Sequence, residues 1–241
     1  MTETQNIPWR RHSIEAAAIV GSILLAFSID AWWEERGLRV EEQQVLQGLR
    51  SEFHYISDVL SEHMSEHLQD LHTLENFLDA AGNGGVEEAR PIVIATLLVL
   101  LTPMTSDLGS GALDSLLNSG RIEILTNRTL RAKLAAWKGV IGEVWDDQAL
   151  NVKAVYEIHI PYFLAENIPA GAAMRQWYEE SPFPLRPPFD DPDMVSRLLS
   201  DEKLRAMVEI RYAYKRHTKN EFEIAVAAVN EILSEIDSSI H

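Results

Sequence analysis

The sequence predicts an all-α protein in which one N-terminal transmembrane helix continues into an antiparallel bundle of long helices. Residues 14–33 form an apolar stretch long enough to span a bilayer. Apolar residues then recur at steps of three and four over residues 40–81, which is helical spacing. We therefore expect a short tail (1–13), an anchor (14–33) and a helical extramembrane domain (34–241).

The anchor is predicted from length, composition and flanking residues. An α-helix rises about 1.5 Å per residue, so about 20 residues cross the hydrocarbon core. Residues 16–29 carry no charge. The alternatives are a cleaved signal peptide and a buried core helix. No convincing signal-peptidase site lies near Ala31, and a core helix would not need tryptophans at both ends, so a retained anchor is favoured. Side chains suited to the membrane interface lie at both ends of the stretch: Trp9, Arg10, Arg11, Trp32 and Trp33.

One face of the anchor carries small or polar side chains every four residues, at Ala18, Ser22, Ala26 and Asp30. Small residues let two helices approach closely in lipid, and an acidic residue at membrane depth usually faces protein or water. This stripe is therefore either a docking face for another transmembrane helix or a set of small residues that an ordinary anchor tolerates.

Flanking charges give a weaker indication of orientation. Arg10 and Arg11 precede the anchor, whereas Arg36 and Arg39 follow it. The short tail with two adjacent arginines favours a cytoplasmic N-terminus. We therefore expect a single-pass membrane protein with most of the chain in the periplasm.

Composition excludes several classes of function. The net charge of −16 argues against a nucleic-acid partner, since phosphate binding needs clustered Lys and Arg. The chain has no cysteine, which rules out disulfides, thiolate metal sites and a cysteine nucleophile. We expect no cofactor.

Glycine and proline delimit the predicted helices of the domain. A helix over residues 38–81 can run on continuously from the anchor, with Gly37 as the favoured position for a joint, and residues 82–85 are expected to stop it. Pro91 is expected in the first turn of the next helix, which ends at Pro103.

The remaining helices are expected at 111–118, 128–165 and 201–236. Gly120 ends the first, Thr126 or Asn127 caps the second, and Pro161 bends it. The proline-rich segment 167–193 is expected to be extended, with one possible helical turn near 174–179. The starts at 125–131 and 199–205 are similar, and we interpret both as ordinary N-caps rather than a duplication.

The best candidate for chemistry is His63 with His67, four residues apart in an H-x-x-E-H sequence. Two such histidines share a helical face and could bind a metal, with His72 or Glu62 as a third ligand. However, His67 lies in line with the apolar residues that recur over residues 40–81, which we call the apolar seam. Packing is therefore the favoured interpretation.

Two further groups of side chains are noted. The aromatic residues of 137–163 are expected in the core, with a ligand pocket as the alternative. A basic stripe near Tyr212 and Tyr214 is expected to face the acidic helices: Arg211, Lys215, Arg216 and Lys219.

Two stretches resemble a family of uncharacterised bacterial membrane-anchored proteins, a domain of unknown function. Residues 29–36 read IDAWWEER, close to that family's Ile-Asn-x-Trp-x-Glu-Glu-Arg-like signature after the anchor. Residues 113–131 resemble its later Leu-x-x-Ser-Gly and Leu-Arg pattern. Asp30 stands where Asn is usual, and Trp33 where a polar residue is common. The resemblance implies an anchor, a cytoplasmic N-terminus and a helical extracytoplasmic domain, and it supplies no catalytic residues.

The function predicted from the sequence is a non-catalytic accessory or scaffolding subunit of a larger inner-membrane complex. Its expected partners are the lipid bilayer and other integral membrane subunits, or a second copy of itself. The alternative is a periplasmic module that binds or senses a small molecule or metal. A His/Glu metallohydrolase is the third and weakest hypothesis.

Overall fold

The computed structural model describes residues 9–83, 86–105, 108–109, 111–174 and 192–240. Every regular element in these residues is a helix, which confirms the all-α prediction. The elements are α1 (Trp9–Asn83), α2 (Val86–Leu101), α3 (Gly111–Asn118), the 3₁₀ helix η1 (Arg121–Ile124), α4 (Arg128–Ala154), the π-helix η2 (Val155–His159), α5 (Ile160–Ala165), α6 (Ala170–Ala173), α7 (Pro192–Leu199) and α8 (Glu202–Ser239).

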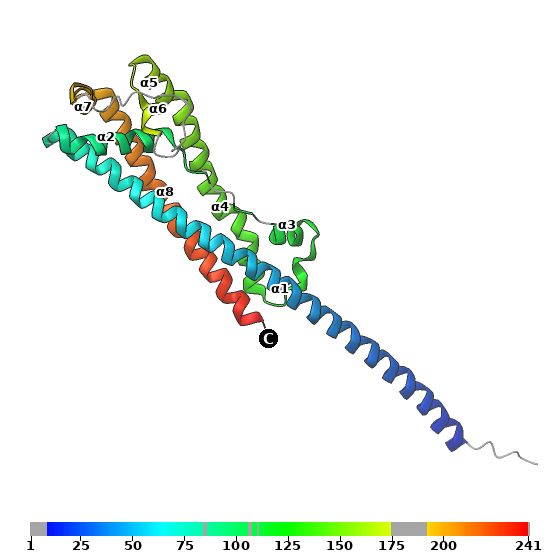
Figure 1. Ribbon diagram of the computed structural model, residues 1–241. Coiled ribbons are helices and arrows are strands. Elements are labelled where there is room, and N and C mark those ends of the chain that lie inside the picture. The colour runs from blue at the N-terminus through cyan, green and yellow to red at the C-terminus, as the bar shows by residue number, and fades with distance from the viewer. Residues whose placement is uncertain (1–8, 84–85, 106–107, 110, 175–191, 241) are drawn as a thin grey trace, which may run out of the picture.

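Helix α1 is one unbroken helix of 75 residues, about 110 Å long at 1.5 Å per residue. Every residue from Glu15 to Val40 is exposed, and burial of one face begins at Glu42. The first part of the helix therefore projects from the bundle as a free rod (Figure 1). It is the one helix among the described residues that is long and apolar enough to span a membrane. The helix runs through Gly37 without a joint.

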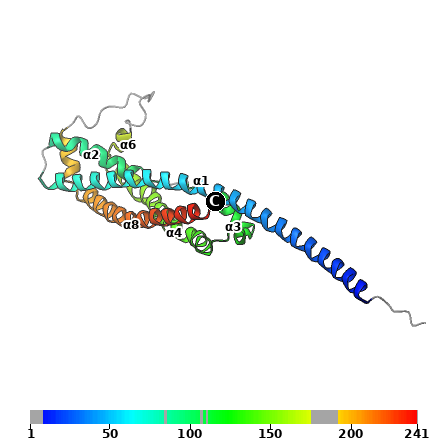
Figure 2. The same ribbon diagram turned by 90° about the horizontal axis from the view of Figure 1, so that it is seen from below.

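The bundle is built along the second half of α1. Helix α8 runs antiparallel beside it, and its end lies near the point where α1 leaves the bundle (Figures 1 and 2). Helix α4 packs against α8, while α2 folds back along the far end of α1. The short α3 and η1 lie at the base and pack on α1.

Buried apolar residues form two separate cores. The proximal core, nearest the free rod, joins α1, α3, α4 and α8 and includes Leu49, Phe53, Leu134, Trp137, Phe222 and Val229. The distal core joins α1, α2, α5, α6, α7 and α8 and includes Phe77, Val93, Leu97, Phe163, Val195 and Val208. Between the two cores, the buried positions are His67 and Leu71 on α1, and the polar residues Arg211, Lys215 and Thr218 on α8.

The caps match the sequence prediction. The Asn127 side chain accepts a hydrogen bond from the Leu130 amide at 3.0 Å. The Asp201 carboxylate accepts from the amides of Lys203 and Leu204 at 2.9 and 3.0 Å. Each residue satisfies amides that a helix start leaves without partners, so both similar starts are N-caps.

The structure corrects three boundaries. Helix α2 begins at Val86, so Pro91 lies inside it rather than in its first turn. Segment 167–193 is not simply extended, because α6 and the start of α7 lie within it; residues 175–191 lie outside the described residues. The expected bend at Pro161 is a π-helix that ends two residues earlier. Proline cannot donate to the carbonyl four residues back, so the preceding turn widens.

Candidate functional site

The stripe of small residues lies on the projecting rod. Ala18, Ser22, Ala26 and Asp30 are all exposed. At 3.6 residues per turn, the stripe lies about half a turn around the axis from the face of α1 that packs on the bundle. The Ser22 hydroxyl donates to the Ile19 carbonyl at 2.8 Å, so it needs no partner outside its own helix.

The expected interface residues are placed in part. The side chains of Trp9, Arg10 and Arg11 lie outside the described residues, although their backbone begins α1. Trp32 and Trp33 are exposed, with ring centroids 5.2 Å apart. The Arg36 guanidinium lies 5.6 Å from the centre of the Trp32 ring, a cation–π contact just beyond the apolar stretch.

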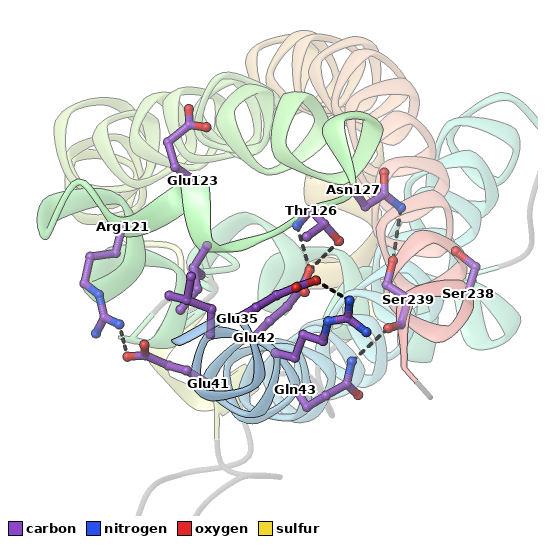
Figure 3. A pocket seen from close by; sticks show the side chains of 13 residues that line it. Glu35, Glu41, Glu42, Gln43, Arg121, Glu123, Thr126, Asn127, Ser238 and Ser239 are labelled. Atoms are coloured by element: carbon purple, nitrogen blue, oxygen red, sulfur yellow. Dashed lines mark hydrogen bonds and ion pairs between the residues drawn. The ribbon is translucent and has the colours of Figure 1, made fainter. Parts of the chain in front are cut away.

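A recess of about 1020 Å³ lies at the base of the bundle (Figure 3). By helical count, the α1 residues Leu38 and Glu42 that line it lie on the side of α1 opposite the stripe. Its walls tie three elements together. The Thr126 amide and hydroxyl donate to the Glu42 carboxylate at 2.6 and 2.8 Å. Gln43 donates to the Ser239 carbonyl, and Asn127 to the Ser239 hydroxyl, both at 3.1 Å. These bonds fix the start of α4 and the end of α8 on α1 where the free rod begins.

A polar layer separates the two cores. It consists of His67 and Asp70 on α1, Asn151 on α4, His159 in η2, and Arg211 and Lys215 on α8. The Lys215 side chain is 1% exposed, and its ammonium donates to the Asp70 carboxylate at 2.6 Å. Burial lowers the pKa of Lys215, and the Asp70 charge opposes this shift. Of the basic stripe, Lys215 therefore faces acidic α1 as expected, whereas Lys219 pairs with Glu223 of its own helix and Arg216 is exposed.

The two histidines of the polar layer are neutral donors. Nε2 of His67 donates to the Lys215 carbonyl at 2.6 Å, and Nδ1 of His159 donates to the Leu100 carbonyl at 2.7 Å. Burial, with a smaller contribution from the Lys215 charge, lowers the pKa of His67 to about 4. Burial also lowers the pKa of His159. Each carbonyl can only accept, which fixes the tautomer of each ring.

Arg211 is the least satisfied member of the polar layer. It is 2% exposed, and its Nη1 donates to the Asn151 side chain. Its Nε and Nη2 are buried without a hydrogen-bond partner. Burial lowers its pKa to about 10, so it stays charged at neutral pH.

Arg211 lines a cavity of about 220 Å³ between α4, η2 and α8. Asn151 and His159 lie beside it, and Lys153, Glu157 and Tyr214 also line the cavity. The rest of the wall is apolar and consists of Leu150, Ala154, Ile158, Met207 and Ile210. The cavity wall is thus mainly apolar, and Arg211 contributes little exposed surface to it.

Among the described residues, the structure does not bring further metal-binding side chains to the proposed ligands His63 and His67. His67 uses Nε2 for the Lys215 carbonyl, and no group of three or more His, Asp or Glu side chains within the described residues is arranged to hold a metal ion. The H-x-x-E-H sequence therefore gains no further ligand there, and His67 packs beside Phe222, with ring centroids 5.6 Å apart.

Sequence reasoning identified the basic stripe but missed Asn151 and His159. A lone Asn and a lone His in a long helix carry no spacing signal. The one available cue was Pro161, which follows His159 closely and predicts a local change in the helix.

No family model, curated protein or solved structure matches the chain. The resemblance to uncharacterised bacterial membrane-anchored proteins therefore remains an expectation drawn from the sequence of residues 15–131.

Proposed function

We propose that the protein is a non-catalytic, membrane-anchored accessory or scaffolding subunit of a larger complex in a bacterial inner membrane. One observation carries the proposal: a single helix is fully exposed and apolar in its first part and forms part of the bundle core in its second. Exposed Leu, Ile, Val and Phe side chains along such a length are costly in water and favourable in lipid.

The same helix offers a surface for a partner. The stripe lies on the side of α1 that the bundle leaves uncovered, and this side stays exposed along the bundle. Its exposed residues beyond the anchor include Gln44, Gln47, Ser51, Tyr55, Asp58 and Gln69. A neighbouring helix can therefore pack along α1 from the bilayer into the domain without displacing α4 or α8.

The flanking arginines favour a cytoplasmic N-terminus and hence a periplasmic bundle. With this orientation the recess at the base faces the outer surface of the inner membrane. Glu42 follows Trp33 by nine residues, or about 14 Å of helix, which is about twice the roughly 5–8 Å that one headgroup region adds to the hydrocarbon core.

The proposal is tested by extracting the full-length protein in mild detergent and analysing the native-gel band by mass spectrometry. We expect defined stoichiometric membrane subunits in the band. A photo-crosslinking residue at Ala26, on the stripe, should capture one of them. The matched control is the same residue at Leu24, which lies on the opposite side of the anchor and should capture none.

Migration as a monomer or homodimer, without other subunits, would contradict the role in a larger complex. Equal crosslinking from Ala26 and Leu24 would show that the stripe does not orient the partner.

A further inference from the structure

We propose that the cavity between α4, η2 and α8 binds a small, neutral, apolar molecule of about nine non-hydrogen atoms, the size of indole. This inference goes beyond the role of the anchor and does not depend on it. It rests on the exposure and length of the apolar wall, the volume of the cavity and the pairing of the charges around it.

The apolar wall of the cavity is uncovered. Leu150, Ile158 and Ile210 come from three different elements, line one cavity and are each more than half exposed. Met207 lines the same cavity and is buried. Removing large aliphatic side chains from water is favourable, so an apolar ligand that covers them is stabilised there. The π-helix forms part of the wall, and single π-turns inside α-helices frequently mark functional sites.

The apolar wall is too short for a partner helix. It extends from Leu150 to Ile158 on one side and from Met207 to Tyr214 on the other, which is about 10–12 Å of helix on each. A docked amphipathic helix of three turns is about 16 Å long. It would extend beyond the apolar residues, and Asp146, one turn before Leu150, is exposed and charged. The wall therefore fits a small molecule.

The volume of the cavity sets the size of that molecule. An apolar cavity of about 150 Å³ holds benzene. The volume here is about 220 Å³, which in proportion has room for about nine non-hydrogen atoms. Indole is a neutral molecule of this size and serves as the probe.

The charged groups around the cavity favour a neutral ligand. Nε and Nη2 of Arg211 are buried, and its Nη1 donates to Asn151, so the guanidinium is out of reach of a ligand. Lys153 and Glu157 line the cavity, but both are exposed and pair with each other at 3.9 Å. An ionic ligand would therefore bury its charge without a buried partner, which is costly.

The test is methyl nuclear magnetic resonance of the full-length protein in lipid nanodiscs, titrated with indole. A bound aromatic ring shifts the resonances of nearby methyl groups, so this local readout separates bound indole from indole dissolved in the bilayer. We expect saturable shifts of the Ile158 and Ile210 methyls, with a Kd in the high micromolar to millimolar range for so small a ligand. Ile224, an exposed isoleucine of α8 outside the cavity, should not shift.

Two ions of similar size test the requirement for a neutral ligand. Benzoate carries a negative charge and phenethylammonium a positive charge, and each has a compact apolar body. Each should bind at least about tenfold more weakly than indole, because each would bury a charge without a partner.

Two variants separate the site from the fold. Ala154→Leu fills the cavity and should weaken indole binding at least about tenfold. The matched control is Ala149→Leu, because Ala149 is exposed on the same helix outside the cavity, and it should bind like the wild type. Both should retain the helical circular dichroism spectrum. Ile210→Ser removes an exposed apolar part of the wall without disturbing the core, and it should lower the affinity read from Ile158 about fivefold.

Several results would overturn the proposal. These are no saturable shift with indole, binding of benzoate or phenethylammonium as tight as that of indole, or unchanged binding by both Ala154→Leu and Ile210→Ser. Shifts of the Ile158 and Ile210 methyls on raising the protein concentration, without a response to indole, would also overturn it and would assign the cavity to contact with a second copy of the chain.

Discussion

At the scale of single residues, the polar layer makes the bundle sensitive to charge. If only nondirectional apolar contacts joined α1 and α8, these helices could pack in several registers. Directed bonds from His67 to the Lys215 carbonyl and from Lys215 to Asp70 align α1 with α8 in one register. Buried polar groups are costly unless every partner is present, so changes at these positions have large effects.

Acidification should destabilise the protein through His67. Its pKa is about 4 in the folded state against an ordinary 6.5, so the unfolded chain binds more protons between these values. The free energy of unfolding should therefore fall as the pH falls from 6.5 towards 4, by about 3 kcal/mol from this group, and the effect should level off below 4.

Chemical denaturation of the full chain in detergent across this pH range measures the effect. His67→Gln keeps a donor for the Lys215 carbonyl but does not titrate, so its pH dependence should be shallower than that of the wild type. Parallel pH profiles for the two proteins would contradict the assignment.

The Lys215–Asp70 pair should respond asymmetrically to substitution. Asp70→Ala leaves the fully buried Lys215 ammonium without its hydrogen-bond partner and should cost about 3 kcal/mol of unfolding free energy. Lys215→Met replaces the buried charge with an apolar chain and leaves Asp70, whose side chain is 26% exposed, to water. That variant should lie within about 1 kcal/mol of the wild type. Equal losses in urea unfolding would contradict this.

At the scale of elements, the continuity of α1 decides how the anchor and the bundle are coupled. A helix without a break transmits tilt and rotation, whereas a joint at Gly37 would absorb them. No atom lies within 4 Å of a Cβ built at Gly37, so a side chain is accepted there.

Rigidity through Gly37 can be measured by distance. The chain has no cysteine, so Ser28→Cys and Ser51→Cys allow spin labels about 35 Å apart along the helix. We expect a narrow distance distribution in nanodiscs that Gly37→Ala leaves unchanged and Gly37→Pro broadens, because proline breaks a helix interior. A broad wild-type distribution that narrows in Gly37→Ala would show a joint instead.

The long helices can be predicted from the sequence, whereas short helices and the surroundings of single buried side chains cannot. The seam of α1 and the capping residues Asn127 and Asp201 carry strong local signals, and the structure contains all of them. Helix α7 was missed because proline-rich surroundings hide an eight-residue helix, although Pro192 begins it. The basic stripe was visible, but the orphaned nitrogens of Arg211 depend on what η2 and α4 place around it, which no local pattern encodes.

At the scale of the whole molecule, the orientation of the bundle in the cell is the central expectation. The absence of cysteine again provides the test, because Ser65→Cys gives one exposed thiol on the bundle. We expect a membrane-impermeant maleimide to label it in spheroplasts without lysis, since the bundle is expected in the periplasm. Thr2→Cys, in the short tail, is the matched control and should be labelled only after lysis. The opposite pattern would reverse the orientation.

The unbroken helix also sets a rotational phase between membrane and domain. Each residue inserted between Trp33 and Glu41 would turn the anchor by about 100° relative to the bundle and lift the bundle by about 1.5 Å. A partner that contacts both the stripe and the bundle should still bind after an insertion of about seven residues, which nearly restores the angle between the anchor and the bundle. It should no longer bind both surfaces after an insertion of two residues. The eight residues 34–41 would then act as a spacer of fixed length, and binding of such a partner would depend more on the length of this spacer than on its composition.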